Sequence, residues 1–125
     1  MSRKPEQRIA EIIFCCEKIL RFTSGMNQEQ LVEQELVMDA VLRNIEIIGE
    51  ATKNLPDNVR ARMPGIEWRK IAGMRDWLSH VYYRVDPDIV WDAVETKVPE
   101  LMRTLLGRVD KFWARCVDWA TATGP

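Results

Sequence analysis

Apolar residues recur at intervals of three and four along the first half of the chain, which is the spacing of one face of an α-helix. A first helix is predicted from about Pro5 to Phe22, ended by the turn-forming segment Thr23–Gly25. A second, longer helix is predicted from about Gln28 to Asn54. It ends at Leu55-Pro56, since a proline disfavours helical geometry in the residue before it.

The second half of the chain continues the helical pattern. A short helical turn is predicted over residues 57–63, and a further helix runs from Trp68 to about Ser79. A last helical region begins at Asp86-Pro87, with aspartate as the cap and proline in the first turn, and runs towards Trp119. Pro99 lies inside that region, so we expect a kink or break near Val98.

No stretch alternates apolar and polar residues for long enough to indicate a strand. The pattern therefore predicts an all-α fold, an antiparallel bundle of four to five helices joined by short loops. With 125 residues, the chain is long enough for one buried core and too short for two, so residues 1–125 are expected to form a single domain.

Composition agrees with a soluble, globular protein, because 46% of the residues are hydrophobic and 30% are charged. The formal net charge is −1, so contact with a nucleic acid needs a local basic patch. Candidates for that patch are Arg60, Arg62, Arg69 and Lys70. No run of 18 apolar residues suggests a membrane span, and the odd count of three cysteines is typical of reduced thiols in a cytosolic protein.

Candidate chemistry gathers in the segment RDWLSHVYY, residues 75–83, which contains the only histidine of the chain. On a helix, Arg75 and His80 are separated by five residues and thus by about 140° around the axis. They cannot both point straight into one pocket from a straight helix. Either the helix loosens near Ser79-His80, or the long arginine side chain reaches round, or a second copy of the chain completes the site.

These residue types suit metal-free cleavage of an RNA phosphodiester. A neutral imidazole at His80 can take a proton from a 2′-hydroxyl group or return one to the leaving oxygen. The guanidinium of Arg75 can hold the phosphate and stabilise the charge that develops on its oxygens. Asp76, one helical turn before His80, can fix the imidazole tautomer. One histidine without nearby cysteines makes no zinc site, so we expect neither a metal nor a cofactor.

A purely structural interpretation remains open at this point. Asp76 and His80 have the spacing of an ion pair on a helix face or at an interface. The neighbouring aromatic residues, Trp77, Tyr82 and Tyr83, occur more often in cores and interfaces than as platforms for stacked bases. Spacing alone favours the structural interpretation over the catalytic one.

The segment RDWLSHVY, from Arg75 to Tyr82, resembles the R-x-x-x-x-H-x-Y motif of HepT-like proteins, which are toxin ribonucleases of the HEPN superfamily. DAVLRNIEIIGEA at residues 39–51 is similar to the second-helix signature of that family. WRKIAGMRD at residues 68–76 and VDPDIVW at residues 85–91 are similar to its segments flanking the motif. The resemblance covers about residues 8–106, and four collinear blocks are more specific than the arginine–histidine spacing.

The resemblance implies a homodimer in which the motifs of both chains meet in a shared cleft. It assigns Arg75 to the phosphate and His80 to catalysis, with Asp76 as the polar residue that follows the arginine. Tyr82 matches the tyrosine that a partner minimal nucleotidyltransferase, the antitoxin, modifies by adenylylation. Such a group would add bulk and negative charge two residues from His80 and lower the activity. Tyr83 has a neighbouring hydroxyl group and is a candidate for additional or alternative modification, and also for supporting the cleft.

Arg43, Glu46 and Glu50 lie three and four residues apart within the second-helix block. They form either an intrahelical charge ladder or, as the resemblance suggests, a support for the cleft.

Together, these observations predict a metal-independent endoribonuclease toxin that cleaves RNA, with tRNA as a substrate implied by the resemblance. The alternative is a non-catalytic helical module that binds a nucleotidyltransferase and is modified by it.

Overall fold

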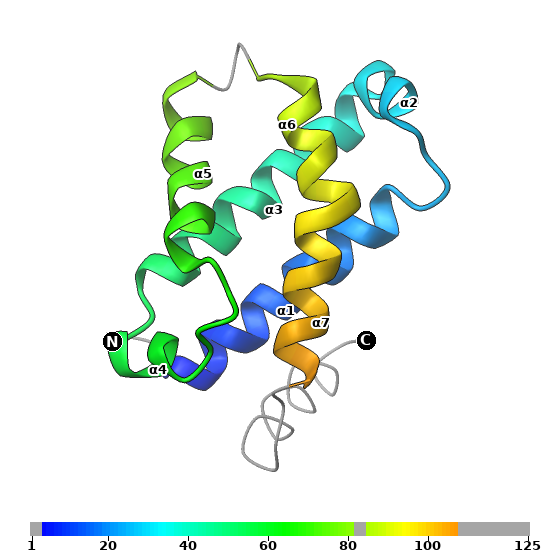
Figure 1. Cartoon of the computed structure of the whole chain (residues 1–125). Helices are drawn as coiled ribbons and strands as arrows, with labels where there is room; N and C mark the ends of the chain where they lie inside the picture. Colours follow the sequence, from blue (N-terminus) through cyan, green and yellow to red (C-terminus); the bar gives the residue numbers. More distant parts are fainter. Residues whose placement is uncertain (1–3, 82–84, 108–125) are drawn as a thin grey trace.

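The computed structural model describes residues 4–81 and 85–107, with residues 76–81 described by their backbone. Within this part of the chain every regular element is helical, which confirms the predicted all-α bundle (Figure 1). The elements in chain order are α1 (Pro5–Phe22), α2 (Gln28–Glu33), α3 (Glu35–Lys53), α4 (Asp57–Ala61), α5 (Trp68–Val81), α6 (Pro87–Asp92), the π-helix η2 (Ala93–Lys97) and α7 (Val98–Gly107).

Several predicted boundaries are confirmed. Helix α1 has the expected bounds, and α4 forms the short turn expected after Pro56. Helix α5 begins at Trp68 as expected and extends to Val81. At the start of α6, Asp86 caps the helix, because its side chain accepts a 2.9 Å hydrogen bond from the backbone N–H of Asp88.

The predicted single helix over residues 28–54 is wrong, since it is divided at Gln34. The backbone of Gln34 has φ −98° and ψ 84°, outside the helical range, and separates α2 from α3. The break allows α2 to pack near α6. Leu31 of α2 is fully buried, and Gln28 Nε2 donates a 2.6 Å hydrogen bond to Asp88 Oδ1. Tertiary contacts of α2 therefore override the local helical pattern at Gln34.

A kink or break was expected near Val98; no break occurs there, but an irregularity of the helix lies directly before it. Helices α6, η2 and α7 form one continuous helical rod, residues 87–107, and the irregularity is the π-helical turn Ala93–Lys97 directly before the proline. Pro99 has no N–H to offer to the preceding turn, and a π-helical turn is a recognised way to accommodate such a change inside a helix. The part of the region predicted towards Trp119 lies outside the described residues.

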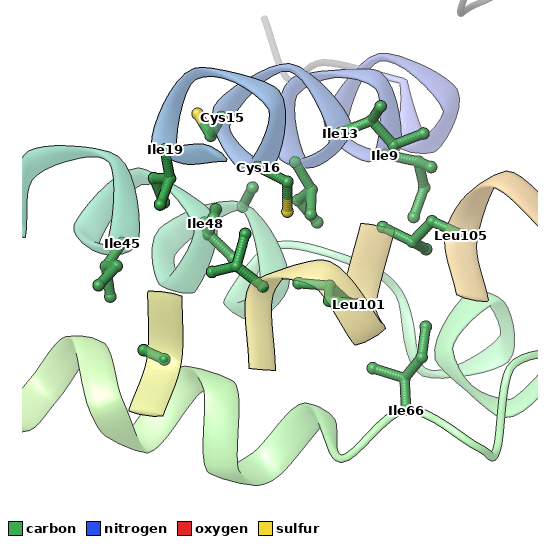
Figure 2. Close-up of a cluster of buried hydrophobic side chains, with 14 of the residues drawn as sticks. Ile9, Ile13, Cys15, Cys16, Ile19, Ile45, Ile48, Ile66, Leu101 and Leu105 are labelled. Atoms are coloured by element: carbon green, nitrogen blue, oxygen red, sulfur yellow. The ribbon is translucent and has the colours of Figure 1, made fainter. Parts of the chain in front are cut away.

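The hydrophobic core lies between α1, α3 and the rod (Figure 2). Helices α1 and α3 run in opposite directions, and α7 packs against α1 (Figure 1). Helix α5 packs mainly against α3, so its support comes from one side. Residues with essentially no exposure from these elements and α2 are Ile12, Cys16, Ile19, Leu31, Val41, Val90 and Leu105. Within the described ranges, no helix has the length and apolar character needed to cross a membrane.

Candidate functional site

Helix α5 carries the RDWLSH segment, and its first residue is fixed from outside the helix. The indole of Trp68 is buried, and its Nε1–H donates to the carbonyl oxygens of Arg60 and Met63, both at 3.2 Å. These bonds satisfy the only polar atom of a large apolar side chain and anchor the start of α5 next to α4.

The α5 backbone remains helical through Ser79 and His80 to Val81. One of the three explanations considered for the motif, a loosening of the helix near Ser79, is therefore contradicted. On a continuous helix, Arg75 and His80 are offset by about 7.5 Å along the axis and about 140° around it. A reaching arginine and a second copy of the chain remain as explanations.

Arg75 lies at the contact between α5 and α3. It is half-buried, its Nε atom is enclosed by protein, and its aliphatic stem rests directly on Gly49 of α3. The stem is thus fixed by packing, which limits the directions in which the guanidinium can extend.

The side chains of the remaining motif residues lie outside the described part of the structure. Asp76 and His80 are described by their backbone, and Tyr82 and Tyr83 lie outside the described residues. Their proposed roles in catalysis and modification stay predictions.

The charged residues of α3 form a surface pair. Arg43 Nη1 lies 3.5 Å from Glu46 Oε2, and the two side chains are 66% and 38% exposed. Glu50 is also exposed. A pair of this kind contributes a few tenths of a kcal/mol. The geometry fits the intrahelical charge ladder for Arg43 and Glu46, while a role in supporting a cleft stays a prediction.

Two of the four residues considered for a basic patch are paired with carboxylates. Arg60 forms an ion pair with Asp57, and Lys70 Nζ lies 2.6 Å from Glu67 Oε2. The hydrogen bond and charge of Lys70 lower the pKa of Glu67, and Glu67 in turn raises the pKa of Lys70. These pairs leave less uncompensated positive charge than the sequence alone suggested. The other two candidates are exposed, Arg62 at the end of α4 and Arg69 in the first turn of α5.

An apolar cavity of about 250 Å³, which the sequence did not predict, lies beside the candidate site. It is enclosed by α3, α5 and the rod, and its lining includes Ile45, Ile48, Ile71, Met74, Val98 and Leu101. Met74 directly precedes Arg75, so the cavity borders the segment that carries the motif. Glu67, Lys70, Lys97 and Glu100 also line the cavity, whereas Arg75 does not. The cavity is therefore distinct from the predicted contact of Arg75 with RNA.

Side chains able to hold a metal do not gather in residues 4–75 and 85–107 in groups of three or more. Cys15 and Cys16 are buried free thiols of α1. Burial raises the pKa of the Cys15 thiol, and it raises the pKa of the Cys16 thiol to about 12. Because the thiolate is the form that ligates metals and attacks substrates, both are structural thiols.

Comparison with known proteins identifies the family. The family model described as Ribonuclease HepT-like matches residues 12–106. A candidate RNase of Caldanaerobacter subterraneus subsp. tengcongensis is 36% identical, over 79% of this chain and 88% of its own length. A candidate ribonuclease HepT of Thermococcus cleftensis is 37% identical over 81% of this chain and 92% of its own, and a candidate RNase of Methanocaldococcus jannaschii is 36% identical over 74% and 80%.

No solved structure shows significant similarity to the chain. The described fold is an all-α helical bundle, the class that the helical pattern predicts. The chain belongs to the HepT-like ribonuclease family. The matched range includes α3 and all of α5, and it ends one residue before the end of α7.

Proposed function

We propose that this protein is a metal-independent endoribonuclease that acts as a homodimer and is the toxin of a toxin–antitoxin pair. The observation that carries the proposal is the match to a ribonuclease family across residues 12–106, a range that contains both Arg75 and His80. The continuous backbone of α5 supports it, because it keeps those two residues at a fixed offset.

The fixed offset is the reason for proposing a dimer. Two groups about 140° apart on one helix face different directions. A two-fold axis near the end of α5 brings Arg75 of one protomer and His80 of its partner towards the same phosphodiester. Helix α5 suits such an arrangement, since its packing within the protomer is mainly against α3.

The chemistry follows from the two side chains. The imidazole of His80 removes the proton from the 2′-hydroxyl, whose oxygen attacks the adjacent phosphorus. The bond from phosphorus to the 5′-oxygen breaks, and that oxygen receives a proton. The guanidinium of Arg75 stabilises the charge on the non-bridging oxygens. The products are a 2′,3′-cyclic phosphate and a 5′-hydroxyl end, and tRNA is the substrate class that we propose.

The proposed antitoxin is a minimal nucleotidyltransferase that adenylylates Tyr82, with Tyr83 as an additional target. The tyrosine oxygen forms a bond to the α-phosphorus of ATP, and pyrophosphate leaves. The added group places a phosphate and a nucleoside two residues from His80, where it occupies the RNA site and repels the RNA backbone.

The decisive experiment incubates purified protein with total RNA and with tRNA in the presence of EDTA. We expect cleavage by the wild type, products with cyclic-phosphate ends, and loss of cleavage in His80→Ala with unchanged circular dichroism and molar mass. Arg75→Ala is expected to lose most of the activity as well, by about 100-fold or more.

The alternative of a non-catalytic module makes the opposite prediction. In that case the wild type leaves RNA intact under conditions where light scattering shows the dimer, while it still binds the nucleotidyltransferase. Cleavage that requires added Mg²⁺ would instead contradict the metal-independent mechanism.

A further inference from the structure

Gly49 of α3 faces Arg75 of α5 at very short range. A Cβ atom placed on Gly49 would lie 2.1 Å from the Cβ of Arg75, 2.8 Å from its Cγ and 3.4 Å from its Cα. Ordinary contacts of a Cβ atom begin near 3.4 Å. The two helices are therefore as close at this point as the absence of a side chain permits.

The other described glycines do not share this environment. At Gly65, Gly73 and Gly107 an added Cβ meets nothing within 4 Å, and Gly25 serves a turn with φ +76°. Glycine is unfavourable in the interior of a helix, because it loses the most backbone freedom on folding. Gly49 lies inside the 19-residue helix α3, four residues before its last residue, so the close approach of α5 is the physical reason for a glycine there.

The atoms that press on Gly49 belong to the near end of the Arg75 side chain. The Cβ and Cγ of an arginine cannot swing aside as its flexible end can, since their positions follow from the helix backbone and the χ1 rotamer. Any side chain at position 49 must push α5 away from α3 or turn the stem of Arg75. Either change moves the guanidinium at the far end of that stem.

We propose that Gly49 is a positioning residue for Arg75: its bare backbone seats the arginine stem and so sets where the guanidinium meets the phosphate. This inference rests on the proposed function, because it assigns a consequence for RNA cleavage to the packing of Arg75. Gly49 itself touches no substrate.

The test compares Gly49→Ala with Gly73→Ala, a matched control on α5 where the new methyl group meets open space. Under single-turnover conditions with RNA in EDTA, Gly49→Ala is expected to lower the cleavage rate by about 10- to 100-fold. Gly73→Ala should stay within about two-fold of the wild type. Wild-type rates in Gly49→Ala overturn the inference.

A double-mutant cycle separates positioning from general damage. If Gly49 acts through Arg75, Gly49→Ala has little further effect on the cleavage rate in an Arg75→Ala background. Losses that multiply independently in the double variant overturn the inference, because they indicate a defect unrelated to the arginine.

A second measurement covers the case in which Gly49→Ala does not fold. Arg75→Gly removes the Cβ and Cγ atoms that clash, so Gly49→Ala is expected to lower the melting temperature much less in the Arg75→Gly background than in the wild type. Equal decreases of the melting temperature in both backgrounds would show that the Gly49–Arg75 contact is not the cause. Lack of cleavage by the wild type contradicts the proposed function, whereas the melting-temperature cycle still tests the Gly49–Arg75 contact.

Discussion

At the scale of single residues, packing and hydrogen bonds fix the positions of several side chains. Arg75 is held along its stem by Gly49, and Trp68 is held by two backbone carbonyls. Cys16 has no exposed surface and is enclosed by apolar neighbours from α1, α3 and the rod (Figure 2). The partners of Arg75 and Cys16 include residues distant in sequence, whereas those of Trp68 lie five and eight residues before it. In each case the residue type alone does not show the constraint.

Burial of Cys16 makes stability depend on pH in the alkaline range. Its thiol pKa is raised from 9.0 to about 12 by desolvation, whereas the unfolded chain titrates at the ordinary value. Below pH 9 the Cys16 thiol is protonated in both the folded and the unfolded state, so its titration does not lower the free energy of unfolding. As the pH rises from 9 towards 12, the unfolded chain alone releases the proton, so the free energy of unfolding falls by up to about 1.4 kcal/mol per pH unit.

Urea unfolding at pH 8, 9 and 10 measures this effect when the wild type is compared with Cys16→Ala. The variant is less stable at every pH because it leaves a cavity, but its stability should decline less steeply. Parallel declines in the two proteins would show that another group is responsible.

At the scale of elements, local residues account for the limits of most helices. They do not account for the division between α2 and α3. Prolines and capping residues set the limits of α1, α4 and α6, as the sequence predicts. The division at Gln34 has no proline or glycine to mark it and follows from the packing of α2 near α6. The π-helical turn Ala93–Lys97 lies directly before the helix that contains Pro99, which has no N–H to donate to the preceding turn.

The start of α2 offers a test of how much capping contributes. Asn27 Oδ1 accepts a hydrogen bond from the Gln30 N–H, and Gln30 Oε1 accepts one from the Asn27 N–H, both at 2.9 Å. We expect Asn27→Ala to lower the free energy of unfolding by about 1 kcal/mol, since the first turn loses an acceptor.

The matched control for this prediction is Asn27→Asp, which retains a side-chain oxygen at the cap and should stay within a few tenths of a kcal/mol. Urea unfolding at neutral pH measures both variants. Equal stability of the alanine variant and the wild type would mean that the cap contributes nothing measurable, and that α2 is held by the burial of Leu31 and the Gln28–Asp88 hydrogen bond.

At the scale of the whole molecule, the proposed dimer predicts complementation between inactive variants. If one site takes Arg75 from one protomer and His80 from its partner, then a heterodimer of Arg75→Ala and His80→Ala chains contains one intact site. After subunit exchange of equal amounts, random pairing gives about a quarter of the wild-type activity.

Differently tagged chains that co-purify provide the control that exchange has taken place. Exchange without any recovery of RNA cleavage would mean that Arg75 and His80 act from the same chain, and the two-fold site would be wrong.

Sequence patterns predicted the helical class and most helix limits, because these depend on periodicity, prolines and caps within a few residues. The candidate motif was also visible, since Arg75, His80 and Tyr82 lie close together in the chain. The seat of Arg75 on Gly49 was not, although a glycine inside a helical pattern was a signal of close packing. The cavity beside Met74 was equally hidden, because it depends on how three helices fit together.

The one-sided support of α5 has a consequence for motion. Helices α1 and α3 and the rod enclose the core, whereas α5 packs mainly against α3 and borders the cavity that lies between α3, α5 and the rod. Its amide protons should therefore exchange with deuterium sooner than those of α1, through openings that leave the rest of the bundle intact. A partner bound to α5 would slow that exchange. Hydrogen–deuterium exchange of the α5 amides would therefore detect assembly at this helix.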